Sequence, residues 1–396
     1  MIAIALKMLL GDRAKYFGLL FGITFTSFLV TFAASYFGGM MTRSFALIAE
    51  SPADVWVMDP AVVAVDRTIN LPASALNRVR SVAGVLSAVP LALATADARF
   101  PNGRFQSVQV IAVDDATLTG VPLMTDGATA SVLRTPDAVI VDDGGSSGKL
   151  DTPSERADQW PRGRPHLDVP MRPLATGDEL LINDTRVRIA GRSMALPRFP
   201  PRPLLFTTFS TAGRILLPER RRLTFVLVTA APGVDPRALA TRIETATALR
   251  ARSSVDFKAD TVRWMVTNSE DVGDAVTMLT IAMLVGFGVT GVMMFMFTNE
   301  NLKYYAVLNA MGATARQIVG MVFVQAAICA LLGAGLGLGL CAIAGRMFTL
   351  YNFPFRLMWF APVAGGAAVV LVSIGAAALS MRPVLKMQPA SFLAGR

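Results

Sequence analysis

The hydrophobic pattern of this chain is dominated by four long stretches that carry no charged side chain. They cover residues 16–42, 275–299, 317–345 and 357–381. Each is mostly apolar and exceeds the roughly 20 residues that an α-helix needs to cross about 30 Å of hydrocarbon. The first stretch stands alone, and the other three lie close together near the end of the chain. This spacing predicts a four-helix membrane protein with one large domain between the first and second helices.

The inserted domain mixes strand-like and helix-like patterns. Strands are expected at runs rich in Val and Ile that turn-forming residues bound, namely 55–58, 106–113, 138–141, 185–190 and 223–228. Helices are expected at 72–82 and 236–249, and the second opens with Asp235 as N-cap and Pro236 at the first helical position. Strands scattered between helices predict an α+β domain rather than an all-β one.

Basic residues distinguish the two sides of the membrane. The net charge is +9, but residues 39–274 hold 27 Lys and Arg against 26 Asp and Glu, so the excess lies beside the apolar stretches. This distribution argues against nucleic acid as a partner and favours contact with anionic membrane lipid. Lys7 and Lys15 precede the first stretch, and Lys303 and Arg316 follow the second. By the positive-inside rule both termini and the 299–316 loop are cytoplasmic, and the α+β domain is extracytoplasmic.

Motifs for soluble-type catalysis are incomplete. The glycine-rich run at 144–150 looks like a phosphate loop, but it lacks the first glycine and the Ser or Thr that follows the lysine. His166 is the single histidine and has no cysteine nearby, so a zinc site or a Ser-His-Asp triad is not expected. The acidic pairs at 114–115 and 142–143 fit either calcium ligation or strand-end turns. We therefore expect no catalytic, cofactor-binding or metal-binding residues, and no enzyme activity in this chain.

The third apolar stretch contains two interleaved GxxxG pairs, Gly333/Gly337 and Gly335/Gly339. Missing side chains allow a second helix to approach closely, and such contacts drive helix association in lipid. Both pairs are therefore expected to pack helices. The stretches also lack the ionisable residues that proton relays place inside the membrane, so the energy for any work must be supplied from outside the spans.

The segment between the second and third stretches predicts a short cytoplasmic helix. Residues 298–319 read TNENLKYYAVLNAMGATARQIV. Apolar Tyr304, Val307, Leu308 and Met311 share one side, and Gly312 is a typical helix end. Thr314 is a candidate N-cap for the helix that follows.

At this segment the sequence resembles the MacB/FtsX-like family of ABC transporter permeases, the type VII or mechanotransmission type. The family motif vLrAlGAt..qI is matched by AVLNAMGAT at 306–314 and by Gln317-Ile318, with Asn309 in place of the usual arginine. The TGDEL run at 176–180 is similar to a strand of the family's periplasmic domain. The opening ALKMLLGDRAKY and the run at 301–305 look closest to the DevC-like permeases.

The resemblance implies a subunit that pairs with a second copy of itself and binds a separate cytoplasmic ABC ATPase. ATP and Mg would be held by that ATPase, and this chain would bind no cofactor. A periplasmic membrane-fusion or adaptor protein is the further partner implied. The ATPase-coupling residues would be Glu300, Lys303, Tyr304, Val307, Leu308, Met311, Gly312 and Ala313. The implied location is the bacterial inner membrane, and the implied task is export of a lipid-like or other hydrophobic substrate.

The expected fold class is an α-helical membrane protein with four transmembrane helices plus a large α+β periplasmic domain between helices 1 and 2. Its expected parts are an amphipathic segment at 1–15, transmembrane helices at 16–42, 272–298, 317–345 and 357–381, a periplasmic domain of two subdomains at 43–271, a coupling loop at 299–316, an external loop at 346–356 and a cytoplasmic tail at 382–396. Two alternatives remain open: an FtsX-like signalling permease that controls a cell-wall hydrolase, and a membrane-anchored receptor or scaffold.

Overall fold

The chain forms two compact units in a computed structural model that describes residues 7–8, 13–146, 149–155, 164–217 and 223–385. One unit comprises Met1–Met40 and Glu270–Arg396, and we call it the membrane unit. The other comprises Met41–Ser269, and we call it the exported domain after the location that the sequence predicts. Most of the expected N-terminal segment 1–15 and of the tail 382–396 lies outside the described residues.

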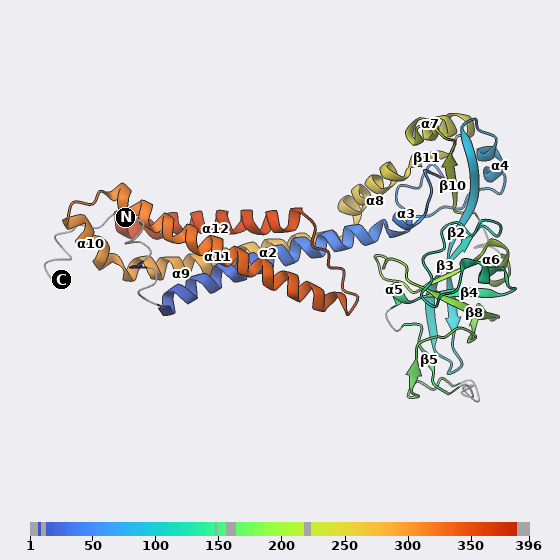
Figure 1. The fold of residues 1–396 in the computed structure, drawn as a ribbon, viewed down its shortest axis with the longest axis horizontal. Helices are drawn as coiled ribbons and strands as arrows, with labels where there is room; N and C mark the ends of the chain where they lie inside the picture. The colour runs from blue at the N-terminus through green and yellow to red at the C-terminus, as the bar shows by residue number, and fades with distance from the viewer. Residues whose placement is uncertain (1–6, 9–12, 147–148, 156–163, 218–222, 386–396) are drawn as a thin grey trace. The chain divides into compact units, whose positions relative to one another are not determined.

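Four long helices make up the membrane unit (Figure 1): α2 (Arg13–Ser44), α9 (Glu270–Glu300), α11 (Ala315–Thr349) and α12 (Phe360–Leu385). All four are long and apolar enough to cross a membrane. The short helix α10 (Leu302–Ala310) lies between α9 and α11. Leu19 and Ile23 of α2, with residues of α9, α10, α11 and α12, form the buried core of this unit. The expected fold class, four candidate transmembrane helices with a large domain between the first and the second, is confirmed.

The exported domain is built on a nine-stranded sheet in the order β11-β1-β10-β2-β3-β9-β4-β8-β7, and β7 also pairs with β2. The strands are β1 (Val55–Met58), β2 (Val85–Arg99), β3 (Phe105–Val113), β4 (Ala138–Asp142), β7 (Glu179–Ile182), β8 (Thr185–Ser193), β9 (Leu204–Thr208), β10 (Phe225–Ala230) and β11 (Arg250–Ser253). The β2–β7 pairing closes the last six strands into a barrel. A separate small ribbon pairs β5 (Thr152–Pro153) with β6 (Met171–Arg172).

Strand β2 belongs to both halves of the exported domain (Figure 1). Its first part, from Val85 to Leu91, pairs with β10, and its second part, from Ala92 to Arg99, pairs with β3. Alternate side chains of the barrel strands, such as Ala96, Val110 and Leu205, fill the barrel interior. Period-two alternation therefore places one face of each strand inside the barrel.

Short helices flank both parts of the sheet. They are α3 (Ala46–Glu50), α4 (Ala75–Arg80), α5 (Asp143–Ser146), α6 (Phe209–Ile215), α7 (Pro236–Thr247) and α8 (Ser254–Asn268), with a 3₁₀ turn at Ala130–Arg134. Helices α4, α7 and α8 contact strands of the open part, whereas α5, α6 and the 3₁₀ turn contact strands of the barrel. Leu239 and Ile243 of α7 pack with Val79 of α4 in one apolar core. Asp235 caps α7 by accepting a hydrogen bond from the Ala238 N–H at 3.0 Å, and Pro236 follows it, as predicted.

The strands expected from the sequence are present, with shifted ends. The run predicted at 223–228 forms β10 two residues later, and the helix predicted at 72–82 shortens to Ala75–Arg80. Strands β2, β5, β6, β9 and β11 were not predicted, and β2 is the longest of the described strands. The composition of β2 conceals it, because it contains five alanines and Pro90.

Candidate functional site

The short helix α10 ends where its glycine predicts. The N–H of Ala313 donates to the Leu308 carbonyl at 3.0 Å, and the N–H of Gly312 donates to the Asn309 carbonyl at 2.9 Å. Gly312 has φ +96°, a conformation that side chains rarely adopt. These two bonds and the left-handed glycine form a Schellman motif, which satisfies carbonyl groups at the end of α10.

Helix α11 begins directly after this turn. Thr314 is its N-cap residue, and its N–H donates to the Gln317 side-chain oxygen at 2.8 Å. The expectation that Thr314 starts the next helix is confirmed. The Gln317 contact is half of a capping box, so both ends of the α10–α11 connection are fixed by local hydrogen bonds.

Three large apolar side chains of this segment are exposed. Tyr304 is 63% exposed, Val307 48% and Met311 71%. We call these three side chains the α10 face. The sequence also placed Leu308 on this side, but Leu308, like Ala313, packs partly buried against the core of the membrane unit. The charged residues Glu300 and Lys303 are exposed at the start of the segment.

A buried tyrosine, which the sequence analysis missed, anchors α10 from its opposite side. Tyr305 is fully buried, and its hydroxyl group donates to the side-chain oxygen of Gln325 on α11 at 3.4 Å. Ala306 is buried beside it. The sequence does contain a sign of this burial, because Tyr304 and Tyr305 are adjacent and neighbouring side chains on a helix point about 100° apart. One therefore faces outward while the other faces the spans.

The two glycine pairs of α11 have different environments. A Cβ added at Gly333 would lie 2.6 Å from the Ile23 side chain, and one at Gly337 would lie 2.5 Å from the Ser27 side chain. This pair lets α2 and α11 approach closely. At Gly335 and Gly339 an added Cβ would meet no described atom within 4 Å. Among the described atoms of one chain, Gly333/Gly337 is the pair that packs against another helix, and the expectation for Gly335/Gly339 stays a prediction.

The acidic pairs of the exported domain have protein partners. Asp114 accepts a hydrogen bond from the Thr117 N–H at 2.9 Å, and Asp143 forms an ion pair with Arg192 at 2.9 Å. Among the residues that the structure describes, no group of three or more His, Cys, Asp or Glu side chains could hold a metal ion. These contacts favour the strand-end turn over calcium ligation.

A cluster of buried charges ties the start of the exported domain to its barrel. Asp142, fully buried at the end of β4, accepts hydrogen bonds from the N–H groups of Gly145 and Ala195, both at 2.6 Å. Burial raises the pKa of its carboxyl group despite these bonds. Glu50, the last residue of α3, accepts a hydrogen bond from the Leu196 N–H. The neighbouring Arg198 is 5% exposed, and burial lowers its pKa to about 10.

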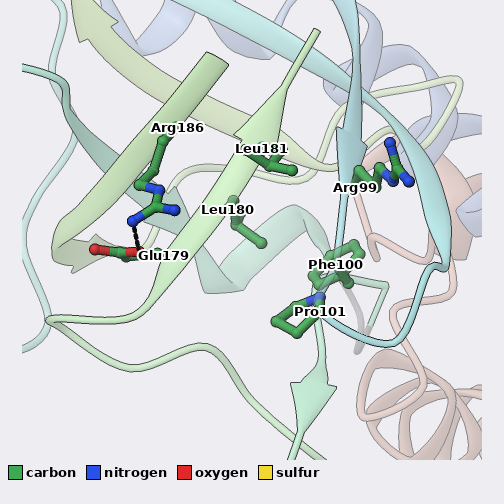
Figure 2. Close-up of a pocket in the computed structure, with 7 residues that line it drawn as sticks. All are labelled: Arg99, Phe100, Pro101, Glu179, Leu180, Leu181 and Arg186. Carbon is green, nitrogen blue, oxygen red and sulfur yellow. Dashed lines mark ion pairs between the residues drawn. The ribbon is translucent and has the colours of Figure 1, made fainter. Parts of the chain in front are cut away.

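A pocket of about 410 Å³ lies beside β7, in the barrel (Figure 2). In this view Glu179 and Arg186 point toward one another and form an ion pair at 3.3 Å, while Phe100 and Pro101 line the opposite side. The one carboxylate among its lining residues, Glu179, is held by this ion pair. Arg99, which also lines the pocket, forms an ion pair with Asp184 at 3.4 Å, so the charged side chains of the pocket have partners within the barrel.

Part of the membrane unit is similar in sequence to a known protein family. Residues 276–389 match the FtsX-like permease C-terminal family. A comparison with curated protein sequences gives no match. The matched region contains α10, the α10 face and both glycine pairs.

Solved structures similar to the exported domain are remote in sequence. The extracellular domain of the noncanonic ABC-type transporter YknZ from Gram-positive bacteria shares 12% identity, with 51% of this chain and 99% of that chain covered and a TM-score of 0.33. The periplasmic region of MacB from Actinobacillus actinomycetemcomitans shares 13%, covering 56% and 96%, with a TM-score of 0.35. A permease domain from Porphyromonas gingivalis shares 14%, covering 51% and 89%, with a TM-score of 0.28.

The chain is thus a multi-pass membrane protein, and its residues 276–389 are similar to an FtsX-like permease domain.

Proposed function

We propose that this protein is the permease subunit of an ABC-type export complex, and that it couples ATP hydrolysis by a separate cytoplasmic ATPase to movement of its exported domain. The observation that carries the proposal is the α10 face, in which three large apolar side chains are exposed within the region that matches the permease family. A helix that presents apolar side chains on one side suits a groove on a partner protein.

The buried contacts of α10 would transmit a displacement of the α10 face to the spans. Tyr305 and Ala306 are buried against α9 and α11, and the Schellman turn at Gly312 fixes the start of α11. Helix α9 continues without a break from Glu270 to Glu300, and Ser269 alone separates it from α8 of the exported domain. A packed element moves as a unit rather than deforming continuously, so a shift of α10 would be transmitted along α9.

This mechanism accounts for the composition of the spans. Mechanotransmission needs no charged path through the membrane, and the interiors of the four apolar stretches carry no charged side chain. The substrate would be lipid-like or otherwise hydrophobic, delivered with a periplasmic membrane-fusion or adaptor protein, as in DevC-like systems. The chain would pair with a second copy in the bacterial inner membrane with both termini cytoplasmic. Glu300 and Lys303 would flank the ATPase contact.

The test is purification of the tagged protein from its native membranes, followed by mass spectrometry and an ATPase assay. We expect a stoichiometric ATP-binding subunit. Met311→Asp should lower permease-dependent ATPase activity at least about tenfold, because a carboxylate is costly to bury without a partner. The matched control is Met347→Asp, since Met347 is 61% exposed at the other end of α11.

Equal effects of the two substitutions would contradict the role of the α10 face. Absence of an ATP-binding subunit under mild detergent would contradict the transporter assignment. A cell-wall hydrolase that co-purifies through the exported domain, with no substrate exported, would support the FtsX-like signalling function instead.

A further inference from the structure

The loop that joins α11 to α12 is held in place against α2. Asn352, with φ +57°, follows the end of α11, and the N–H of Phe353 donates to the Phe348 carbonyl at 3.2 Å, as in a Schellman motif. The N–H of Arg356 donates to the carbonyl of Ser35 in α2 at 3.1 Å. These hydrogen bonds fix the loop at the end of the spans where α12 begins.

Aromatic side chains on the inner side of the loop pack against α2. The centroid of the Phe353 ring lies 6.0 Å from that of Phe32 and 5.2 Å from that of Tyr36. The centroid of the Phe355 ring lies 5.5 Å from that of Phe32. Aromatic pairs at such separations are favourable, so the outward side chains of the loop extend from a backbone that is anchored on α2.

The outward side chains of this segment combine aromatic rings with positive charge. Leu350 is 82% exposed, Tyr351 84% and Trp359 77%. Arg346 and Arg356 are exposed as well, and among the described residues no carboxylate forms an ion pair with either arginine. We call these five side chains the loop face. In the topology that the sequence predicts, this loop is extracytoplasmic, so the positive-inside rule does not explain its two arginines.

The loop lies level with one boundary of the hydrocarbon layer. The part of α2 from Tyr16, where its charge-free stretch begins, to Ser35 is about 30 Å long at a rise of 1.5 Å per residue, which is the thickness of that layer. The Arg356 backbone is bonded to Ser35, and Trp359 stands directly before the first residue of α12. Trp and Tyr are enriched at this boundary, and guanidinium groups bind phosphate through charge-assisted hydrogen bonds.

We propose that the loop face binds the phospholipid headgroup layer of the leaflet on its side of the membrane. The Trp359 ring lies between acyl chains and headgroups, and the guanidinium groups of Arg346 and Arg356 donate to lipid phosphates. The positive charge of the face complements the phosphates, and the exposed apolar surface of the spans continues into it, since Val363 in the first turn of α12 is 61% exposed.

This contact goes beyond the proposed coupling to an ATPase and requires only that the helices span a membrane. It explains why two arginines stand on the side that the positive-inside rule disfavours. It also sets the depth of α2, which leaves the hydrocarbon near Ser35 although its charge-free stretch continues to residue 42.

The first experiment measures the tryptophan fluorescence of the full chain in nanodiscs that contain brominated phosphatidylcholine, because bromine quenches nearby indole rings. The other three tryptophans lie within residues 41–269. We expect bromine near the headgroup end of the acyl chains to quench more strongly than bromine near the chain terminus. Trp359→Phe should remove the quenching. Trp264→Phe, in the exported domain, is the matched control and should leave it unchanged.

A second measurement tests the two arginines. Brominated phosphatidylglycerol diluted into unlabelled phosphatidylcholine should quench Trp359 more than brominated phosphatidylcholine at the same fraction. Each arginine should raise this preference about fivefold, the factor expected for one basic residue near a membrane surface. Arg346→Gln and Arg356→Gln should each lower it by that factor. Arg316→Gln is the matched control, because Arg316 is exposed near the start of α11, and it should leave the preference unchanged.

Three results would overturn the proposal. Quenching of Trp359 by aqueous iodide and not by brominated lipid would place the loop face in water. Protection from both quenchers would show that a protein surface, such as a second copy, covers it. A preference for phosphatidylglycerol that survives in the double variant Arg346→Gln/Arg356→Gln would exclude the phosphate contact. None of these measurements depends on an ATPase partner.

Discussion

Different interactions stabilise the interior of the membrane unit and the interior of the exported domain. In the membrane unit, α2 and α11 approach through Gly333 and Gly337, and the described spans bury no charged side chain. In the exported domain, Asp142 and Arg198 are buried, and ion pairs such as Arg250–Asp260 join its elements. Lipid is as apolar as a side chain, so close packing and not exclusion from water selects helix partners.

This difference predicts which substitutions each unit tolerates. A domain in water gains stability by removing apolar surface from solvent and can position buried charges where hydrogen bonds satisfy them. Helices in lipid gain little from apolar area alone and depend on shape at a few contacts. The membrane unit should therefore be sensitive to added volume, and the exported domain to lost or altered charge.

The largest effect is expected from Gly337→Leu. Its Cβ would lie 2.5 Å from the Ser27 Cβ and 2.6 Å from the Thr24 carbonyl oxygen, so α2 and α11 must separate. We expect a loss of about 3 kcal/mol or more, the upper range for overpacked sites. The measurement is thermal unfolding of the full chain in detergent.

Gly339→Leu is the matched control for this contrast, because its added Cβ would meet no described atom within 4 Å. It should leave thermal unfolding unchanged or slightly raise the midpoint, since leucine favours a helix more than glycine does. Equal destabilisation by both substitutions would contradict the division of the glycine pairs. Loss of the dimer with unchanged unfolding of the monomer would instead indicate that the second copy packs against Gly339.

A smaller effect, confined to the exported domain, is expected from Asp260→Asn. Asp260 is 12% exposed and accepts hydrogen bonds from Arg250 at 2.8 Å and Arg252 at 2.9 Å. We expect a loss of about 2 kcal/mol, because hydrogen bonds to charged groups contribute more than neutral ones. Urea unfolding followed by the fluorescence of buried Trp56 measures it.

Asp184→Asn provides the comparison for Asp260, because Asp184 is 84% exposed and its ion pair with Arg99 is long, at 3.4 Å. It should cost less than about 0.5 kcal/mol, as exposed ion pairs usually do. Salt should weaken the Asp260 effect only partly. Hydrogen exchange in α11 should not respond to either substitution, and a response there would contradict the separation of the two units.

The same division explains what could be predicted from the sequence. The positions and order of the spans follow from runs of residues without charge, and the end of α10 follows from Gly312. Both are local patterns that can be read from neighbouring residues. The barrel depends on contacts between distant segments, such as β2 with β7 and the parallel pairing of β3 with β9. Pro90 and the alanines of β2 argue locally against a strand, and burial between neighbouring strands overrides that preference.

At the candidate site the sequence predicted the α10 face and missed its anchor. Tyr304, Val307 and Met311 are exposed side chains of the segment, as a shared side allows, whereas Leu308 follows buried Tyr305 by three residues and packs partly buried with it. The burial of Tyr305 depends on the approach of Gln325, twenty residues along the chain. The position of α2 likewise decides which glycine pair of α11 packs against another helix. The spacing of the glycines along α11 does not predict that position.

The smallest effects are expected in the pH dependence of the exported domain, where two carboxyl groups act in opposite directions. Burial raises the pKa of Asp142, and a hydrogen bond from Ser253 together with Arg237 lowers the pKa of Asp256. A raised carboxyl pKa means that the folded state takes up a proton more readily than the unfolded state. The contribution of Asp142 therefore falls as the pH rises from about 4 through its folded pKa. The contribution of Asp256 is present above about pH 4 and is lost as the pH falls below it.

Asp142→Asn should therefore flatten the decline in unfolding free energy above about pH 4, and Asp256→Asn should flatten the loss below it. The slope is the readout, because Asp142→Asn also lowers stability at every pH by weakening the bonds from Gly145 and Ala195. Glu50 is half-buried with its pKa raised as well, so a residual slope in the first variant should disappear in the double variant with Glu50→Gln. Hydrogen exchange in β4 and in α11, measured across this range, reports on the two units in one sample. A pH dependence of protection that is confined to β4 would support the contrast between a domain that buries charged groups and spans that do not. An equal pH dependence in α11 would contradict it.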